Sequence, residues 1–114
     1  MTRAIVNRIC ATLPGAEVSD PWGGGHDAWK VCDKLFAVVG ALREGVSVKT
    51  ASIEHAEMLI DAGVSERAPC FHRSWVYLPE TTPEAELHHR LLASYALIRA
   101  GLPKKVQAAL GPVE

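Results

Sequence analysis

The side chains with the clearest potential for chemistry are a cysteine and a histidine two positions apart. Cys70 and His72 would share one face if the segment is a strand, because successive side chains of a strand point to opposite sides. A thiol beside an imidazole is the arrangement of a nucleophilic cysteine, and it is also half of a metal site. No second ligand pair stands at a recognisable spacing. The sequence therefore predicts no catalytic residue, no metal site and no cofactor.

A small-molecule or metal-binding site is an alternative hypothesis. Trp22 lies in a polar, glycine-rich segment, where a large apolar side chain either packs inward or meets a ligand. His26 and His72 are the imidazoles that could complete such a site with Trp22. The neighbouring run Gly23-Gly24-Gly25 lacks the Lys-Ser/Thr of a phosphate-binding loop, so it predicts a turn.

A set of basic and aromatic side chains suggests binding to nucleic acid, because lysine and arginine neutralise phosphates. Lys30 and Lys49 would project from the polar faces of strands. The residues alone favour the simpler interpretation, in which Trp29 and Trp75 are core residues and the lysines keep the protein soluble. A third hypothesis is a protein-interaction module with exposed aromatic side chains. The candidate nucleic-acid-binding residues are Lys30, Lys49, Arg73, Trp75, Lys104 and Lys105.

The overall balance of residues limits these functions. The chain has 114 residues and a formal net charge of −1, which favours one domain spanning residues 1–114 and provides no global positive field. The N-terminal segment has no signal-peptide pattern and no apolar run is long enough to cross a bilayer, so we expect a cytoplasmic protein with no membrane partner and a monomer. Cys10, Cys32 and Cys70 form no disulfide framework; Cys10 and Cys32 are predicted to be buried.

The elements that would position these residues follow from hydrophobic periodicity. Apolar residues at helical spacing predict a helix over 5–13, ended by Pro14-Gly15, followed by a loop over 17–27. Alternation predicts a hairpin of strands 28–32 and 35–40 with Asp33-Lys34 as its two-residue turn, and a further strand over 45–49 in the same sheet.

The second half of the chain predicts two more helices separated by strands. Ser52 and Gly63 are suitable ends for a helix. Residues 68–78 contain two apolar pieces, either a hairpin with a turn near 72–74 or one continuous strand. Thr81 and Glu84 fit a capping box for a helix that ends at Gly101. The order helix, strands, helix, strands, helix predicts an α+β fold, with an antiparallel β-sheet and flanking helices.

An ordered series of short motifs resembles the MmcQ/YjbR family and covers nearly the whole chain. Val48-Lys49 precedes a short helix, and Trp75 falls on a late strand, as that family's pattern requires. The other matching pieces are Leu13-Pro14-Gly15, Pro21-Trp22-Gly23, Trp29-Lys30-Val31, Lys34-Leu35-Phe36-Ala37 and Leu102-Pro103-Lys104-Lys105.

The resemblance implies a fold like that of the CyaY/frataxin group, with a curved antiparallel sheet and flanking helices. Family members are commonly labelled DNA-binding, because the fold resembles a double-wing module of a phage transcription factor; fold alone does not fix function. Carried over to this sequence, that implies a non-enzymatic protein that meets DNA weakly and in a salt-dependent way through its sheet or hairpins. Two segments depart from the family pattern, Phe71-His72-Arg73-Ser74 and Gly23-Gly24-Gly25.

Overall fold

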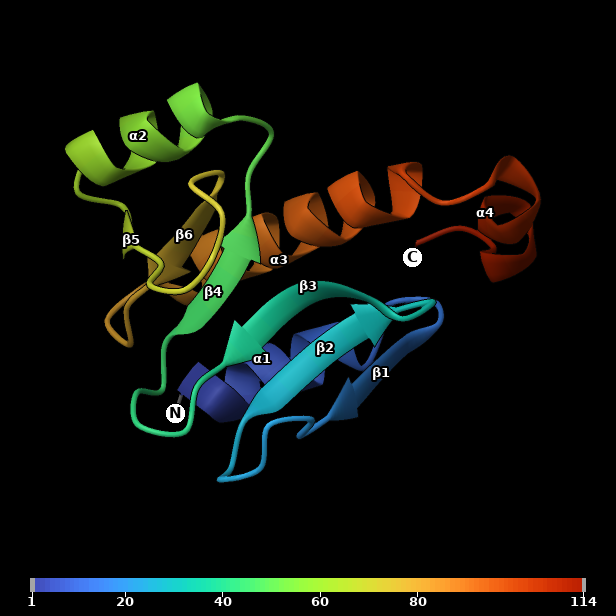
Figure 1. Cartoon of the computed structure of the whole chain (residues 1–114), viewed down its shortest axis with the longest axis horizontal. Helices are drawn as coiled ribbons and strands as arrows, with labels where there is room; N and C mark the ends of the chain where they lie inside the picture. Colours follow the sequence, from blue (N-terminus) through green and yellow to red (C-terminus); the bar gives the residue numbers. More distant parts are fainter. Residues whose placement is uncertain (1, 114) are drawn as a thin grey trace.

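The computed structural model describes residues 2–113 of the chain. Within that range the protein has the α+β fold with an antiparallel sheet and flanking helices that the sequence predicts; the sheet has six strands and there are four helices (Figure 1). The elements in chain order are α1 (Thr2–Cys10), β1 (Ala16–Ser19), β2 (Asp27–Val31), β3 (Lys34–Val39), β4 (Val46–Lys49), α2 (Ile53–Asp61), β5 (Glu66–Arg67), β6 (Trp75–Leu78), α3 (Glu84–Ala100) and α4 (Lys104–Leu110).

The sheet has the strand order β1-β2-β3-β4-β6-β5. The first four strands follow one another as a meander, and β6 then lies between β4 and β5. Helices α1 and α3 pack on one face of the sheet, and their apolar side chains meet Val46, Val48 and Leu78 in the main core. We call the opposite face, which carries Ser47, Lys49, Trp75 and Tyr77 by strand alternation, the outer face.

The turn between β2 and β3 corrects two sequence-based expectations. It consists of Cys32 and Asp33, one residue earlier than predicted, and both have left-handed backbones with φ of 49° and 64°. A two-residue turn of type I′ has that conformation at both positions, and its twist matches that of the strands. Cys32 is consequently exposed, so its predicted burial is wrong, whereas Cys10 is buried as expected and burial raises the pKa of its thiol to about 12.

Three helix boundaries test the capping patterns. Ser52 caps α2 as predicted, since its hydroxyl accepts a hydrogen bond from the backbone N–H of His55. The predicted Thr81/Glu84 capping box is wrong, because Pro83 is the N-cap of α3 and no side chain caps that end. Pro103 follows the end of α3 and is the N-cap of α4, a helix that was not predicted from the sequence.

Two further segments differ from the expectation. The predicted loop over 17–27 overlaps strand β1, which is held by its antiparallel pairing with β2, and also includes the first residue of β2. The second hairpin exists, but its first strand is Glu66–Arg67, and Cys70 and Phe71 belong to the loop that leads to β6. Cys70 has a left-handed backbone with φ of 70°, so it does not share a strand face with His72. No helix in residues 2–113 is long and apolar enough to span a membrane.

Candidate functional site

Strands β3 and β4 stop pairing at the end of β4, and Lys49 is the first residue beyond their last pair. Strands β3 and β4 pair over three residues on each side, from Val46 to Val48 on β4 (Figure 1). At the next position the buried hydroxyl of Ser94 on α3 accepts a hydrogen bond from the backbone N–H of Lys49 at 3.0 Å and donates one to the carbonyl oxygen of Phe36 at 2.6 Å. The hydroxyl thus takes the place of a direct hydrogen bond between the strands and fixes the backbone of Lys49.

The side chain of Lys49 is held on the outer face by a short polar chain. Its Nζ donates to the Oγ of the buried Ser74 at 2.8 Å, and this Oγ lies 2.9 Å from Nδ1 of His72. The backbone N–H of Ser74 donates to the same Nδ1 at 3.1 Å. Because a backbone N–H can only donate, Nδ1 is the accepting nitrogen and the proton of the neutral imidazole is on Nε2.

An aromatic stack lies beside this polar chain. Trp75 is the β6 partner of Lys49 in the sheet register, and its ring stacks on Phe71 with centroids 4.8 Å apart and an interplanar angle of 22°. These two rings and Tyr77 form a small apolar cluster on the outer face, with Ala68 and Leu35. Arg73 precedes β6 and forms an exposed ion pair with Glu57 of α2 at 3.4 Å. The fold therefore brings Lys49, His72, Arg73 and Trp75 together, and we call these residues with Phe71 and Ser74 the Lys49 site.

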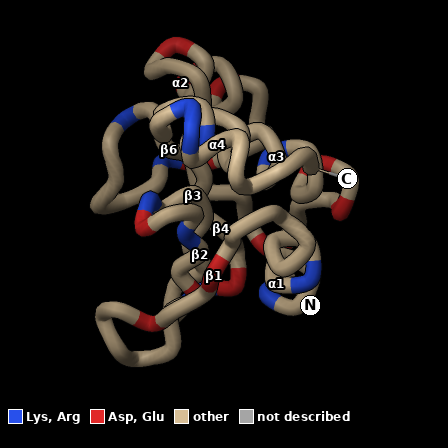
Figure 2. The backbone as a smooth tube through the Cα atoms, turned by 90° about the vertical axis from the view of Figure 1, so that its right-hand side faces the viewer, with Lys and Arg blue, Asp and Glu red and all other residues tan. Residues whose placement is uncertain are grey.

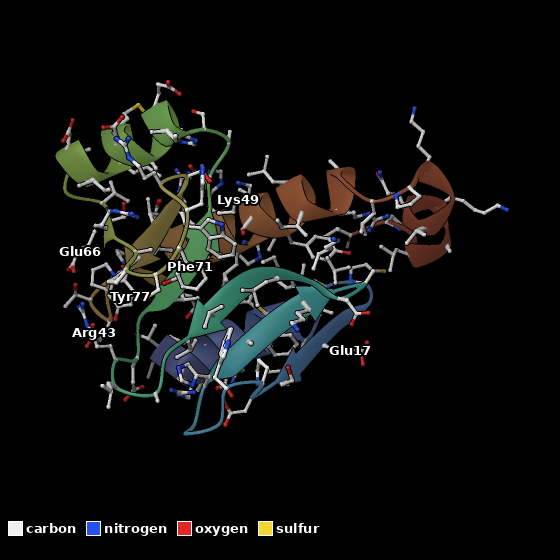
Figure 3. All side chains as sticks on the ribbon, viewed as in Figure 1. Glu17, Arg43, Lys49, Glu66, Phe71 and Tyr77 are labelled. Atoms are coloured by element: carbon white, nitrogen blue, oxygen red, sulfur yellow. The ribbon has the colours of Figure 1, made fainter. Side chains whose placement is uncertain are left out.

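The other end of the outer face carries a basic side chain that is already neutralised. Arg43 lies over the Tyr77 ring, 4.2 Å from its centroid, and pairs with both Glu66 and Glu80 at 3.4 Å (Figure 3). The Tyr77 hydroxyl accepts a hydrogen bond from the backbone N–H of Gly45, and burial raises the pKa of that hydroxyl above its usual value. Free positive charge on this face is accordingly greatest at the Lys49 end.

The remaining basic candidates lie elsewhere. Lys30 is on β2, directly opposite the acidic residue Glu17 of β1. Lys104 and Lys105 are exposed in the first turn of α4, at the far end of the molecule from β6 (Figure 1). Lysines and arginines are distributed over several elements rather than gathered on one side, as Figure 2 shows for α1, α4 and the strands. The six residues predicted from the sequence do not form one continuous surface.

The alternative set of Trp22, His26 and His72 is also divided. Trp22 is 58% exposed and meets the edge of the His26 ring, with centroids 5.3 Å apart. His26 is held within its own loop, because Nδ1 lies 2.9 Å from the Gly23 carbonyl oxygen and its backbone N–H donates to Asp20. His72 belongs to the Lys49 site instead. Across residues 2–113, no three His, Cys, Asp or Glu side chains converge in a way that could hold a metal ion.

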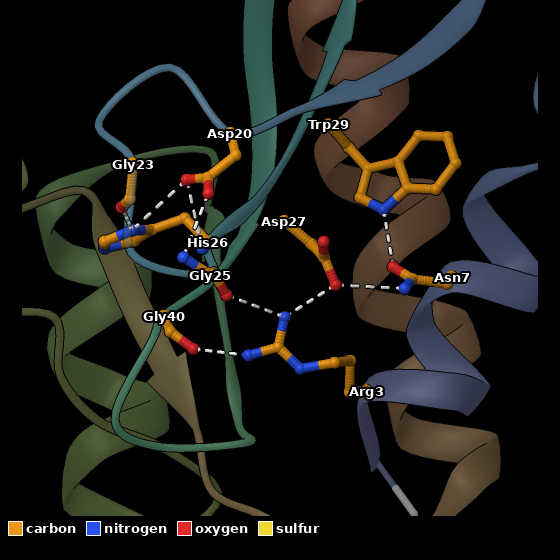
Figure 4. Close-up of polar contacts among 9 residues, drawn as sticks. All are labelled: Arg3, Asn7, Asp20, Gly23, Gly25, His26, Asp27, Trp29 and Gly40. Carbon is orange, nitrogen blue, oxygen red and sulfur yellow. Dashed lines mark hydrogen bonds and ion pairs between the residues drawn. The ribbon is translucent and has the colours of Figure 1, made fainter.

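A polar network that was not predicted from the sequence joins α1 to two loops. Arg3 donates to the carboxylate of Asp27 at 2.6 Å and to the backbone carbonyls of Gly25 and Gly40 at 3.1 and 2.6 Å (Figure 4). Asn7 donates to the same carboxylate at 3.0 Å and accepts from the indole N–H of the buried Trp29 at 2.8 Å. We call these residues the Arg3 network. Arg3 and Asn7 are four residues apart and so share one helix face, which was the available sequence signal.

The carboxylate of Asp27 is tuned by this network. Burial acts to raise its pKa, whereas the hydrogen bonds from Asn7 and Arg3 and the positive charge of Arg3 lower it. The lowering effects prevail, and the pKa of Asp27 lies below its ordinary value. The charged form of the carboxylate is therefore part of the folded state.

Comparison with known proteins places the chain in a family. The family model described as YjbR matches residues 11–97. The chain belongs to the YjbR family. It is 34% identical over 121 aligned residues to the uncharacterized protein YjbR of Escherichia coli K12, with 96% of this chain and 98% of that protein covered, and equally to the YjbR of E. coli O157:H7.

The fold of this YjbR-family chain also matches a solved structure. The crystal structure of the Deinococcus radiodurans protein DR2400, a DUF419-domain protein, superposes with a TM-score of 0.79 and covers 93% of this chain and 85% of that one. The two sequences are 23% identical, so the likeness establishes the shared fold. The resemblance drawn from the short motifs is thus confirmed at the level of family and fold.

Proposed function

We propose that this YjbR-family chain is a non-enzymatic DNA-binding protein that contacts the phosphate backbone through the Lys49 site. The observation that carries the proposal is that Lys49 lies opposite Trp75 of the aromatic stack and contacts Ser74, the residue after the exposed Arg73. We assign only secondary phosphate contacts to Lys30 and to the pair Lys104 and Lys105. The proposal treats residues 1–114 as one domain that acts as a monomer in the cytoplasm.

The chemistry of the Lys49 site suits a polyanion. Ser74 accepts one hydrogen bond from the Lys49 ammonium, and an ammonium has three N–H donors, so Lys49 keeps donors for a phosphate oxygen. Arg73 is exposed, and its single ion pair with Glu57 is long; an exposed pair of this kind is worth little and can be exchanged for a phosphate. Phe71 adds an aromatic edge that a sugar or an unpaired base can contact.

The distribution of charge sets the expected strength of binding. The net charge is −1, and a local cluster of two or three cations neutralises few phosphates, so affinity should be modest and should fall with salt with a slope of only about −2 to −3 on logarithmic axes. The test is a titration of the full-length protein into a fluorescently labelled random-sequence duplex at about 50 and about 150 mM salt. Saturable binding that weakens across this range supports the proposal, and no binding at the lower salt overturns it.

Two double variants with the same change in charge locate the DNA-binding surface. Lys49→Gln with Arg73→Gln should reduce the salt slope of the binding constant by about 2, roughly one for each phosphate that is no longer neutralised. Lys104→Gln with Lys105→Gln removes the same charge from α4, far from β6, and should change the slope by less than about 1. Equal reductions in the two variants would show that DNA binding does not depend on the Lys49 site.

A further inference from the structure

A hollow of about 420 Å³ lies between α3, α4 and the C-terminal segment, and a second hollow of about 330 Å³ lies between α3 and the connection from β4 to α2. We call the second one the hollow; apart from Lys49, its lining residues have no role in the DNA contact proposed above. Its surface is almost entirely apolar, and three basic residues are among those that border it. The lining residues that matter for binding are Lys49, His55, Arg90, Ala93, Leu97 and Ala100.

Two of the basic residues that border the hollow keep hydrogen-bond donors in reserve. The Arg90 side chain is 16% exposed and uses its Nε to donate to Glu86 at 2.6 Å. Within residues 2–113 neither of its terminal nitrogens, nor the ring of His55, has a hydrogen-bond partner. These terminal nitrogens are not among the buried unpaired polar atoms of residues 2–113, so they reach solvent and are open to a ligand. The fold therefore holds a cationic group ready for an acceptor that the chain itself does not supply.

The charge balance of the hollow identifies the acceptor as an anion. Lys49, His55 and Arg90 are basic, and the hollow has no carboxylate among its described lining residues. Glu86 is the acid that touches this group, and it engages the Nε of Arg90 while the terminal nitrogens remain free. Arg presents several donors in a fork that fits a carboxylate or a phosphate. A negatively charged group is complementary to these bordering residues.

The apolar wall identifies the rest of the occupant. From Ala93 to Ala100 the wall extends over about 10 Å, since each helical residue rises about 1.5 Å. It has no aromatic ring on which a base could stack, and few polar groups. A volume near 330 Å³ is at the small end of the range for ligand sites. An unbranched apolar body of medium length matches these dimensions.

We propose that the hollow binds a small amphiphilic anion, with its carboxylate or phosphate at Lys49, His55 and Arg90 and its apolar chain along Ala93 to Ala100. This site and the DNA contact bind different partners, although Lys49 borders both. Lys49 is part of the lining, while its ammonium donates to Ser74 on the outer face. Binding of such a molecule would complete the pairing of Arg90, which the folded chain leaves unfinished.

The test is isothermal titration of the full-length protein with octyl phosphate and, separately, with octanoate. Inorganic phosphate and octanol serve as the head group and the chain alone. We expect one saturable site for at least one of the two amphiphiles, and at least tenfold weaker binding of both fragments. Which amphiphile binds more tightly identifies the head group. Absence of saturable binding of either amphiphile would overturn the proposal.

Variants tie the binding to the hollow. Arg90→Gln and, independently, His55→Gln should weaken binding at least fivefold, and two variants guard against a folding defect in one of them. Arg8→Gln removes an arginine that forms an exposed ion pair with Glu84 on another part of the surface, and it should bind as the wild type does. Arg73→Gln should also leave amphiphile binding unchanged, which separates this site from the DNA contact. Wild-type affinity in both hollow variants would contradict the assignment.

Discussion

Arg3 and Arg90 both lie on helices and are both largely removed from solvent, yet their surroundings differ in one respect. Arg3 has three acceptors, the Asp27 carboxylate and two loop carbonyls, and the Asp27 carboxylate is itself shared with Asn7. Arg90 has one acceptor, the Glu86 carboxylate on its own helix. The first arginine is satisfied by the fold, whereas the second keeps terminal nitrogens without partners among residues 2–113.

This difference separates a structural role from a binding role. A polar group whose partners all come from the folded chain contributes to stability, because its loss leaves those partners unpaired. A polar group with unused donors contributes little to folding and is available to a ligand. We therefore expect changes in the Arg3 network to be measured in unfolding experiments and changes around Arg90 to be measured in binding experiments.

The largest expected effect on stability is that of Arg3→Met. It removes three hydrogen bonds and leaves the Asp27 carboxylate with Asn7 as its remaining side-chain donor, so the free energy of unfolding should fall by about 2 to 3 kcal/mol. Urea unfolding followed by circular dichroism measures it. Arg8→Met on the same helix removes an exposed ion pair and should cost less than about 1 kcal/mol. Equal losses would remove the distinction between satisfied and exposed arginines.

Ser94→Ala should have the next largest effect. It removes the hydroxyl that bridges the N–H of Lys49 and the carbonyl of Phe36, and leaving two buried backbone groups without a partner should cost about 1 to 2 kcal/mol. The amide of Lys49 should also exchange faster with solvent in a hydrogen-exchange experiment, because its hydrogen bond is lost. An unchanged exchange rate would mean that β3 and β4 form a direct hydrogen bond with each other when the Ser94 hydroxyl is absent.

The Arg3 network also makes stability depend on acid. The folded-state pKa of Asp27 is lowered, so the unfolded chain takes up this proton more readily than the folded one. Its contribution is complete above about pH 4, the ordinary range of an aspartate, and is lost as the pH falls through the lower folded-state value. The stability difference between wild type and Asp27→Asn, measured in urea from neutral pH downward, should therefore shrink in acid. A difference that does not vary with pH would contradict this coupling.

The smallest effect on stability is expected for Arg90→Gln. It removes one ion pair between residues four apart on α3, an interaction worth about 0.3 to 0.5 kcal/mol in helices. The midpoint of urea unfolding should stay close to that of the wild type even though binding of the amphiphilic anion is weakened. A destabilisation as large as that of Arg3→Met would show that Arg90 is structural and would remove the contrast between the two arginines.

Much of the fold could be predicted because its strongest elements have local signals. The apolar stripe of α3, the alternation in β2 and β4 and the Ser52 cap of α2 are encoded within a few neighbouring residues. Strand β1 has no such signal, since its four residues are mostly exposed and it exists through pairing with β2. Helix α4 was missed because Pro103 marks the end of one helix and the start of another.

The candidate site was less accessible to sequence reasoning. Lys49, Arg73 and Trp75 were identified by residue type, but their meeting depends on the β4–β6 pairing, and nothing in the sequence indicated that Lys104 and Lys105 would lie apart from them. His55 and Arg90 belong to different helices that are far apart in the chain, and their common hollow depends on where the fold places α2 and α3. Exposure of Cys32 was missed because burial was inferred from residue type rather than from turn geometry.

The bridge made by Ser94 has a consequence for synthesis of the chain. The serine lies 58 residues after Phe36 and 45 after Lys49, so β3 and β4 are made long before the group that joins them at this point. A ribosome adds about 5 to 20 residues per second, and the nascent chain therefore waits several seconds without this bridge between its strands. During that interval the backbone groups of Phe36 and Lys49 can pair with wrong partners, and their hydrogen bonds to Ser94 form only after α3 has been made.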